Sequence, residues 1–187
     1  MFFNSLLFLA LGRIALAAVC NDKQVVHTDE ITTDSGHTLK VQSYSCSNNV
    51  HSDLEPAGQL AKRDEAEVLS KRDARCTTTT APCLCGVPCI FNACRAETQS
   101  IRETDCNTLI TSLQTNSGTF TIQFGDAVGF IFESCEYTLF ATLGTQYCFS
   151  DMGNAAAEML AVCGTTQQAS CKMVSGPLTA FVDQISL

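Results

Sequence analysis

The chain has 187 residues, of which 16% are charged, and its net charge at pH 7 is −8. Nucleic acids and anionic membranes attract basic surfaces, so this charge argues against both as partners. The chain holds 12 cysteines, a density that is rare where thiols stay reduced and normal in small secreted domains. We therefore expect a secreted, extracellular protein.

Residues 1–18 have the pattern of a cleaved signal peptide. The apolar run from Phe2 to Leu11 is too short to span a bilayer, and small residues at the spacing that signal peptidase accepts follow at Ala15, Ala17 and Ala18. No other stretch approaches the roughly 20 apolar residues of a transmembrane helix, so we expect no membrane insertion.

Two Lys-Arg pairs, Lys62-Arg63 and Lys71-Arg72, lie in a polar, acidic stretch without apolar periodicity. A processing protease needs such an exposed segment. The pairs predict a pro-segment over residues 19–63, a dibasic linker over 64–72 and a mature domain over 73–187. The alternative is a charged linker that is not cut.

All three histidines fall in the predicted pro-segment, at His27, His37 and His51. Histidine titrates near the acidity of late secretory compartments, so release of the pro-segment could respond to pH. The alternative is that they are simply exposed residues of a polar segment.

The cysteines divide evenly at the Lys-Arg pairs. Two lie before them, Cys20 and Cys46, and ten lie after them: Cys76, Cys83, Cys85, Cys89, Cys94, Cys106, Cys135, Cys148, Cys163 and Cys171. Each piece can therefore close its own disulfides, although the sequence leaves the pairing open. Cys83, Cys85, Cys89 and Cys94 could imitate a zinc site, but their spacing is unusual and an oxidising compartment favours disulfides, so we expect no metal.

The first elements of the predicted mature domain are short. The β-branched run Thr77–Thr80 suggests a strand, and Gly86 and Pro88 suggest a turn. A helix is predicted over Asp105–Thr115, with Thr104 as its cap and Asp105 at the positive end of its dipole. Its apolar face consists of Cys106, Leu109, Ile110 and Leu113.

Strands then follow one another. Alternation of Phe120, Ile122 and Phe124 predicts a half-buried strand, Gly125-Asp126 a turn, and the runs 128–132 and 135–141 two more strands. A second helix is predicted from about Met152 to Cys163, with Ser150 as cap and Gly164 as stop. Residues 171–174 and 178–185 end the chain. For the last segment we favour a strand, although its apolar spacing also fits a helix.

These elements predict an α+β fold. The expected architecture is a small disulfide-rich α/β sandwich, with an antiparallel sheet that carries two helices on one face, similar to a split βαβ unit. Cys106 and Cys163 lie on the apolar stripes of the two helices, so their disulfides should tie the helices to the sheet.

The predicted mature domain contains no histidine, which excludes Ser-His-Asp and Cys-His catalysis. Carboxylates are the remaining catalytic option, at Asp105, Asp126, Glu133, Glu136, Asp151 and Glu158. Glu133 and Glu136 would lie on opposite faces of an extended strand, and Asp105 and Asp151 have places at helix starts. We therefore expect that the protein is not an enzyme, and that it has no catalytic residue and no cofactor.

Exposed features would then carry the function. Four aromatic residues could form a partner-binding patch or fill the small core: Phe91, Phe140, Tyr147 and Phe149. The sequence does not decide between these two roles, and filling the core is the more common one.

Several motifs carry a resemblance to known families. Asp105-Cys106 with Leu109 and Leu113, then Gly118-x-Phe120-x-Ile122, then Cys135-x-Tyr137, resemble fungal secreted small cysteine-rich proteins, similar to the necrosis-inducing effector family and to the α/β-sandwich killer toxins that kexin matures. The segment 62–67, Lys-Arg-Asp-Glu-Ala-Glu, looks like kexin-type sites of fungal precursors. The resemblance implies a kexin-type processing protease and an extracellular effector-like or toxin-like protein; it transfers no active residue.

Three functions follow from these observations. The first is a secreted effector-like or toxin-like protein that binds an extracellular protein or cell-surface partner. The second is a secreted inhibitor or binding protein, for which Gly86-Val87-Pro88 is the candidate loop between two cysteines. The third is a structural protein of the cell wall.

Overall fold

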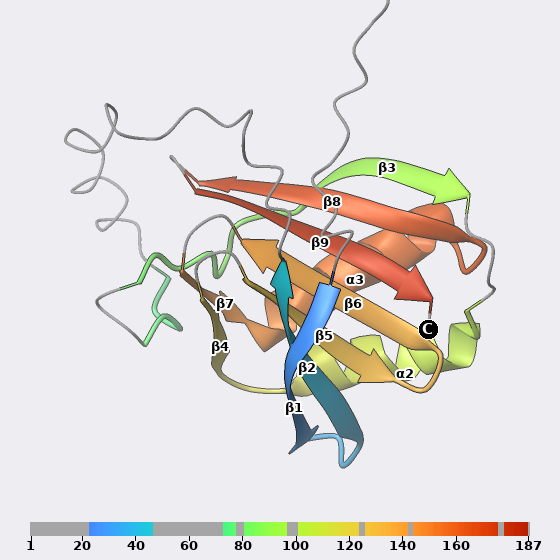
Figure 1. The fold of residues 1–187 in the computed structure, drawn as a ribbon, viewed down its shortest axis with the longest axis horizontal. Helices are drawn as coiled ribbons and strands as arrows, with labels where there is room; N and C mark the ends of the chain where they lie inside the picture. The colour runs from blue at the N-terminus through green and yellow to red at the C-terminus, as the bar shows by residue number, and fades with distance from the viewer. Residues whose placement is uncertain are drawn as a thin grey trace, which may run out of the picture.

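The computed structural model describes residues 23–46, 73–77, 81–96, 101–123, 126–141, 144–175 and 178–186. In these ranges the strands come in groups, three before the first helix, four between the two helices and two after the second, which is an α+β arrangement (Figure 1). The elements in chain order are β1 Lys23–Thr32, β2 Thr38–Cys46, β3 Ile90–Ala96, α2 Glu103–Thr115, β4 Thr119–Ile122, β5 Asp126–Phe132, β6 Cys135–Ala141, β7 Thr145–Cys148, α3 Phe149–Cys163, β8 Gln167–Ser175 and β9 Leu178–Ser186.

The main sheet has seven strands in the order β1-β2-β5-β6-β9-β8-β3, and every neighbouring pair is antiparallel. β6 and β8 therefore run in the same direction, with β9 between them, and α3 connects them. This β6-α3-β8 arrangement is a split βαβ unit. The fold class predicted from the sequence is confirmed.

Both helices pack on one face of the sheet. α2 contacts β5 and β6, whereas α3 contacts β8 and β9, and the two helices contact each other. In Figure 1 both helices lie behind the sheet, which is strongly twisted. The core lies in this layer, where its largest fully buried side chains include Tyr137, Phe130, Leu109, Leu139 and Met152.

The helix α2 begins two residues earlier than predicted, and its cap differs. Arg102 is its N-cap, and no side chain caps it, so the prediction of Thr104 as the cap is wrong. Asp105 is buried and accepts hydrogen bonds from the Ser134 hydroxyl at 2.7 Å and from the Ser134 backbone N–H at 3.2 Å. This carboxylate therefore ties the start of α2 to the β5–β6 turn, a contact that no local pattern predicts.

The helix α3 starts directly after β7. Cys148 is its N-cap without a side-chain hydrogen bond, so the prediction of Ser150 as the cap is wrong, because Ser150 is already inside the first turn. Gly164 ends the helix as predicted: its φ is 66°, and its backbone N–H donates to Leu160 O at 2.9 Å. A positive φ of this kind favours glycine.

The aromatic strand around Phe120 does not join the main sheet. β4 pairs with β7, which the sequence analysis did not anticipate, and together they form a separate two-stranded sheet. The Phe120 ring contacts Phe130 on β5 at 4.8 Å and Phe149 on α3 at 5.1 Å between ring centroids. The small sheet therefore closes one end of the core. Phe124 lies outside the described residues.

Strand and turn predictions around the cysteine cluster have mixed outcomes. Thr77 is not in a strand, residues 78–80 lie outside the described residues, and the strand of this region is β3. The predicted turn at Gly86 is confirmed, with a φ of 78° and a hydrogen bond from Val87 N–H to Leu84 O at 3.0 Å. The last segment is the strand β9, as favoured over a helix.

The largest difference from the sequence analysis is at the N-terminus. Residues 23–46 form the hairpin β1–β2, which extends the sheet by pairing β2 with β5. No strand or helix was predicted from the sequence of this segment. The hairpin and the edge that it covers form the candidate functional site.

Candidate functional site

The hairpin forms because a tight turn separates a run rich in β-branched residues, in β1, from a run in β2 where Leu39 and Val41 alternate with polar residues. Gly36 has a φ of 82°, which favours glycine, and its N–H donates to Thr33 O at 2.8 Å. The Thr33 N–H and hydroxyl both donate to His37 O, at 2.9 and 3.0 Å. Beyond this turn the strands pair antiparallel from Thr32 opposite Thr38 to Lys23 opposite Cys46, with one irregularity in β1.

One strand of the hairpin carries most of its contact with the sheet. β2 pairs with β5 from Lys40 opposite Ile131 to Ser45 opposite Asp126, whereas most of β1 is exposed. Leu39 is fully buried in the main core, and Val41 packs against that core. Tyr44 is buried on the other face, in a small cluster with Ala127 and Phe140. Both faces of β2 are therefore matched to the edge of β5.

Glu136 on β6 is the centre of the contact on the outer face. Its side chain is 3% exposed, and Oε1 accepts hydrogen bonds from the Tyr44 hydroxyl at 2.8 Å, from the Thr138 hydroxyl at 2.6 Å and from Lys23 Nζ at 3.4 Å. Two of these three donors belong to the hairpin. A buried carboxylate needs such partners because water no longer solvates it.

Tyr44 and Lys23 also contact each other. Lys23 Nζ lies 4.8 Å from the centre of the Tyr44 ring, a cation–π distance, and donates to the Thr138 hydroxyl at 3.2 Å. The pKa of Tyr44 is raised, first by burial and then by the charge of Glu136 and the hydrogen bond to it. The phenol therefore stays protonated and remains a donor to the carboxylate.

Gly129 makes room for this cluster. It lies opposite Gln42 in the β2–β5 register and opposite Thr138 in the β5–β6 register. A Cβ atom at this position would lie 2.8 Å from Tyr44 Cε2 and would also overlap the Glu136 carboxylate. Only glycine leaves the space in which the Tyr44 ring reaches Glu136.

A second buried carboxylate lies beside this cluster. Asp183 on β9 is directly opposite Thr138 on one side and Ser170 on the other, so the three side chains share a face. Neither Asp183 Oδ1 nor Ser170 Oγ has a hydrogen-bond partner of good geometry among the described residues. The pKa of Asp183 is raised by burial; Ser170 and the charges of Lys23 and Arg95 oppose this. Lys23 thus affects both carboxylates.

The tip of the hairpin contacts the end of α2. Ser35 donates to the Ser112 hydroxyl at 3.2 Å, and the Ser117 N–H donates to Asp34 Oδ2 at 3.1 Å. The His37 ring meets Phe132 edge-on at 5.8 Å between centroids. These contacts are polar or peripheral, so the docking of the hairpin depends mainly on β2.

The five disulfides that the described residues form all lie outside the hairpin–sheet contact. The ten cysteines of the predicted mature domain pair with one another, as their even number predicted, in the bonds Cys76–Cys83, Cys85–Cys148, Cys89–Cys171, Cys94–Cys163 and Cys106–Cys135. None of these five bonds joins the domain to the hairpin. Cys106 ties α2 to β6, and Cys163 ties α3 to β3, as expected for cysteines on the helix stripes.

The four cysteines weighed as a zinc site each have a different disulfide partner. Two groups of cysteines do lie close together, Cys76 with Cys83 and Cys85, and Cys85 with Cys148 and Asp151. Because their sulfur atoms are bonded in pairs, they offer no thiolate ligands. The proximity comes from disulfide geometry.

The segment after Lys71-Arg72 is fixed to α3 by charge. Arg75 forms ion pairs with Asp73 at 2.7 Å and with Asp151 at 2.8 Å, and Asp151 also accepts from the Gly86 N–H at 2.6 Å. The hydrogen bonds from Arg75 lower the pKa of Asp73 to about 2. Residues 73–75 are therefore held by the domain.

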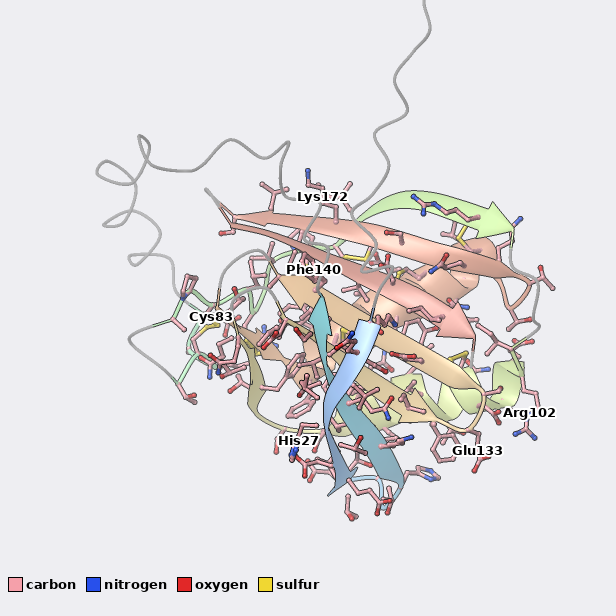
Figure 2. All side chains as sticks on the ribbon, viewed as in Figure 1. His27, Cys83, Arg102, Glu133, Phe140 and Lys172 are labelled. Atoms are coloured by element: carbon pink, nitrogen blue, oxygen red, sulfur yellow. A yellow bond between two sulfur atoms is a disulfide. The ribbon has the colours of Figure 1, made fainter. Side chains whose placement is uncertain are left out.

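Other residues singled out from the sequence are dispersed. Glu133 lies in the exposed β5–β6 turn with a φ of 50°, near Arg102 (Figure 2). Glu136, in contrast, is buried. Asp126 is at the start of β5, and Glu158 is on the exposed side of α3. Glu133 and Asp105 share Arg102 as an ion-pair partner, whereas the other described carboxylates of this set lie apart, and Glu136 is the one that reaches the hairpin.

Where the aromatic residues of the candidate patch are described, Tyr147 and Phe149 pack in the main core, and Phe140 is buried in the small cluster with Tyr44 on the other face of the sheet. Tyr147 is 1% exposed and Phe140 is 5% exposed, while Phe149 packs against the core. The side chain of Phe91 lies outside the described residues, as do Lys62, Arg63, Lys71, Arg72, Cys20, His51 and the side chain of Cys46. His27 is exposed on β1 and bonds Asp29 at 2.7 Å (Figure 2).

The sequence did contain a signal for the hairpin. Leu39 and Val41 alternate with polar residues, and Asp34-Ser35-Gly36 is a turn sequence between two runs of residues that favour strands. The signal was weak because the apolar residues of β1 do not alternate with polar ones and the outer side of β2 is mostly polar. The sequence singled out Glu136 only as a candidate carboxylate; it gave no sign of the contact with the hairpin, because Tyr44 and Lys23 are 92 and 113 residues away.

Together the described residues define a disulfide-rich α+β domain whose sheet is extended by an N-terminal hairpin. No helix in the described ranges is long and apolar enough to cross a membrane. No protein-family model matches the sequence. No curated protein matches it either.

Among solved structures, the chain is similar to the crystal structure of the tandem DUF26 ectodomain from the Arabidopsis thaliana cysteine-rich receptor-like protein PDLP8. The sequences are 11% identical, the TM-score is 0.29, and the match covers 86% of this chain and 79% of that chain. A likeness this distant transfers no function.

Proposed function

We propose that this chain is the precursor of a secreted effector-like or toxin-like protein. Its mature part, residues 73–187, acts by binding an extracellular or host partner rather than by catalysis. A signal peptide directs secretion, and a kexin-type protease cuts at Lys62-Arg63 and Lys71-Arg72. The many cysteines support secretion into an oxidising compartment, and the two Lys-Arg pairs support cleavage by a processing protease.

One observation carries this proposal. All five described disulfides close between Cys76 and Cys171, after both Lys-Arg pairs. A cut at either pair therefore breaks no loop that these disulfides close. The domain after the cut keeps its cross-links, and the ion pairs of Arg75 hold its new N-terminal residues against α3.

Dense cross-linking supports action outside the cell. Disulfides restrict the unfolded chain and persist in oxidising surroundings, so a domain of this size resists proteases there. Such rigidity suits recognition, because little conformational freedom is lost on binding.

The alternative of a protease inhibitor gains less support from the structure. Its candidate loop, Gly86-Val87-Pro88, is held close to the domain: Val87 packs against the core, and the Gly86 N–H is bonded to Asp151. Inhibitor loops that insert into a protease cleft need a projecting side chain. The alternative of a structural cell-wall protein would be supported if fractionation of the producing cells found the mature domain covalently held in wall material.

Intact-mass analysis of the secreted product, with and without reduction, tests the processing. We expect a product that begins at Asp73 and gains ten hydrogens on reduction of five disulfides. The secreted product should then be infiltrated into host tissue and spotted on competing fungi. Inertness in both assays, beside an active effector or toxin as positive control, would contradict the proposed role.

A further inference from the structure

The sheet of the domain after the cut would have an unusual edge. Without the hairpin the order is β5-β6-β9-β8-β3, so β5 becomes an edge strand. Five consecutive residues of β5 are buried, from Ala127 to Ile131. Soluble proteins protect exposed edges with charges, proline or bulges, since an apolar edge invites pairing with another strand. Here β2 provides that protection.

Loss of the hairpin would also remove hydrogen-bond donors from the buried Glu136. Glu136 would lose the Tyr44 hydroxyl and the Lys23 ammonium and keep the Thr138 hydroxyl. Gly129 would leave an open notch beside it, where the Tyr44 ring now lies. On the other face, the place of Leu39 in the core would be vacant. The edge thus has three features that fit one strand: backbone groups, an apolar site and an acidic notch.

The hold on the hairpin changes when the chain is cut. Before the cut, β2 is attached to the domain through residues 47–72, so its effective concentration at β5 is high. None of the five described disulfides crosses the contact. After the cut the hairpin is a separate chain that dilution can remove.

We propose that the β5 edge, with Gly129 and Glu136, is the partner-binding surface of the mature domain, and that the hairpin blocks it in the precursor. The partner contributes an extended strand by β-sheet addition. This strand carries two apolar residues at alternate positions, as Leu39 and Val41 do, and a tyrosine or a lysine on its other face for Glu136. The inference rests on the proposed processing and names the surface that it uncovers.

A first experiment separates this inference from the processing itself. In one version of the full chain, the recognition sequence of an unrelated site-specific protease replaces residues 62–72. Intact masses of the native chain after kexin treatment test the processing. The engineered chain is cut by the site-specific protease instead. It therefore tests whether the β5 edge becomes free to bind, even if kexin does not cut the native chain. Gel filtration at micromolar concentration then shows whether the hairpin leaves.

The probe for the free edge is a fluorescent synthetic peptide of residues 37–45, followed by fluorescence anisotropy. The cut protein should bind it at least about tenfold more tightly than the uncut protein. Replacing Tyr44→Phe in the peptide should weaken binding about fivefold, because the hydrogen bond to Glu136 is lost. The Thr38→Ala peptide is the matched control and should bind like the original.

Three results would overturn the inference. The hairpin stays bound to the cut protein after gel filtration, the peptide binds cut and uncut protein equally, or the Tyr44→Phe peptide binds as tightly as the original. Circular dichroism of the released domain covers one further outcome: loss of its strand signal means that the hairpin is a structural part of the domain, which also contradicts the proposal.

Discussion

Acidic residues show how single residues acquire their roles here. Asp105, Glu136 and Asp151 were singled out as acids that could act in catalysis, and each one uses its oxygens to join distant segments. The Asp105 partner is 29 residues away, and the Tyr44 hydroxyl that bonds Glu136 is 92 residues away. The sequence reveals that these residues are acidic, but only the fold supplies their donors.

The Ser134 hydroxyl should stabilise the protein measurably. Removing it by Ser134→Ala leaves a buried carboxylate with fewer donors, so the free energy of unfolding at pH 7 should fall by about 1–3 kcal/mol. Urea denaturation measures this loss. Thr111→Ala, on the exposed side of α2, is the control and should change stability by no more than about 0.5 kcal/mol.

The same variant should change the response to acid. The pKa of Asp105 is lowered in the folded state, first by the hydrogen bond from the Ser134 hydroxyl. Its stabilising contribution is therefore complete above the ordinary pKa of about 3.9 and is lost as the pH falls through the lower folded-state pKa. Ser134→Ala should flatten the loss of stability below about pH 4. Equal slopes for variant and wild type would contradict this role.

Gly129 should resist substitution because of its two crowded neighbours. In Gly129→Ala the new Cβ meets Tyr44 and Glu136, so the free energy of unfolding should fall by about 1–3 kcal/mol. Gly129→Ala should lower the free energy of unfolding by less in a Tyr44→Ala background, because the Tyr44 ring no longer crowds the new Cβ. Thermal denaturation of the four proteins of this cycle gives the coupling; equal costs in both backgrounds would show that Tyr44 does not limit the space.

At the scale of elements, periodicity was a reliable guide where burial is one-sided. The stripe Met152, Ala155, Ala156 and Met159 predicted α3, and all four side chains are buried. The hairpin was missed because β1 is exposed along most of its length and so has no apolar alternation. β1 is a strand because it pairs with β2. The local sequence of β1 does not encode this pairing.

Leu39 is the test of how firmly this element is docked. Leu39→Ala should lower the free energy of unfolding by about 2–5 kcal/mol, because a fully buried side chain leaves a cavity. Hydrogen exchange should rise more at the amides of β2 than at those of β6. Val25→Ala on β1 is the control, since Val25 is 52% exposed. Unchanged exchange in β2 would show that Leu39 does not hold the hairpin.

At the scale of the molecule, the disulfides connect every layer of the domain. Long-range bonds join the cysteine cluster of residues 76–94 to β7, β8 and α3. The described residues of this segment have little regular structure before β3, so the bonds compensate for sparse backbone pairing there. The same bonds leave the hairpin outside the cross-linked body.

Loop length should rank two of these bonds. Cys106–Cys135 closes 29 residues and Cys76–Cys83 closes 7, so replacing both cysteines by alanine should cost about 3.5 and about 2.5 kcal/mol respectively. The first loss should be larger still, because Cys106 and Cys135 are fully buried. Guanidinium denaturation of the two double variants measures both values; the reverse order would contradict the ranking.

The sequence by itself determined the α+β class, both helices and most strands of residues 119–185. It also determined that the ten cysteines after the Lys-Arg pairs can all form disulfides with one another. These features depend on local periodicity and on counting, which need no knowledge of distant contacts. Only the tertiary structure decided the cysteine pairing, the separation of β4–β7 from the main sheet, and the place of β2 beside β5. Each of these joins residues far apart in the chain, where shape and burial, rather than neighbouring residues, select the partner.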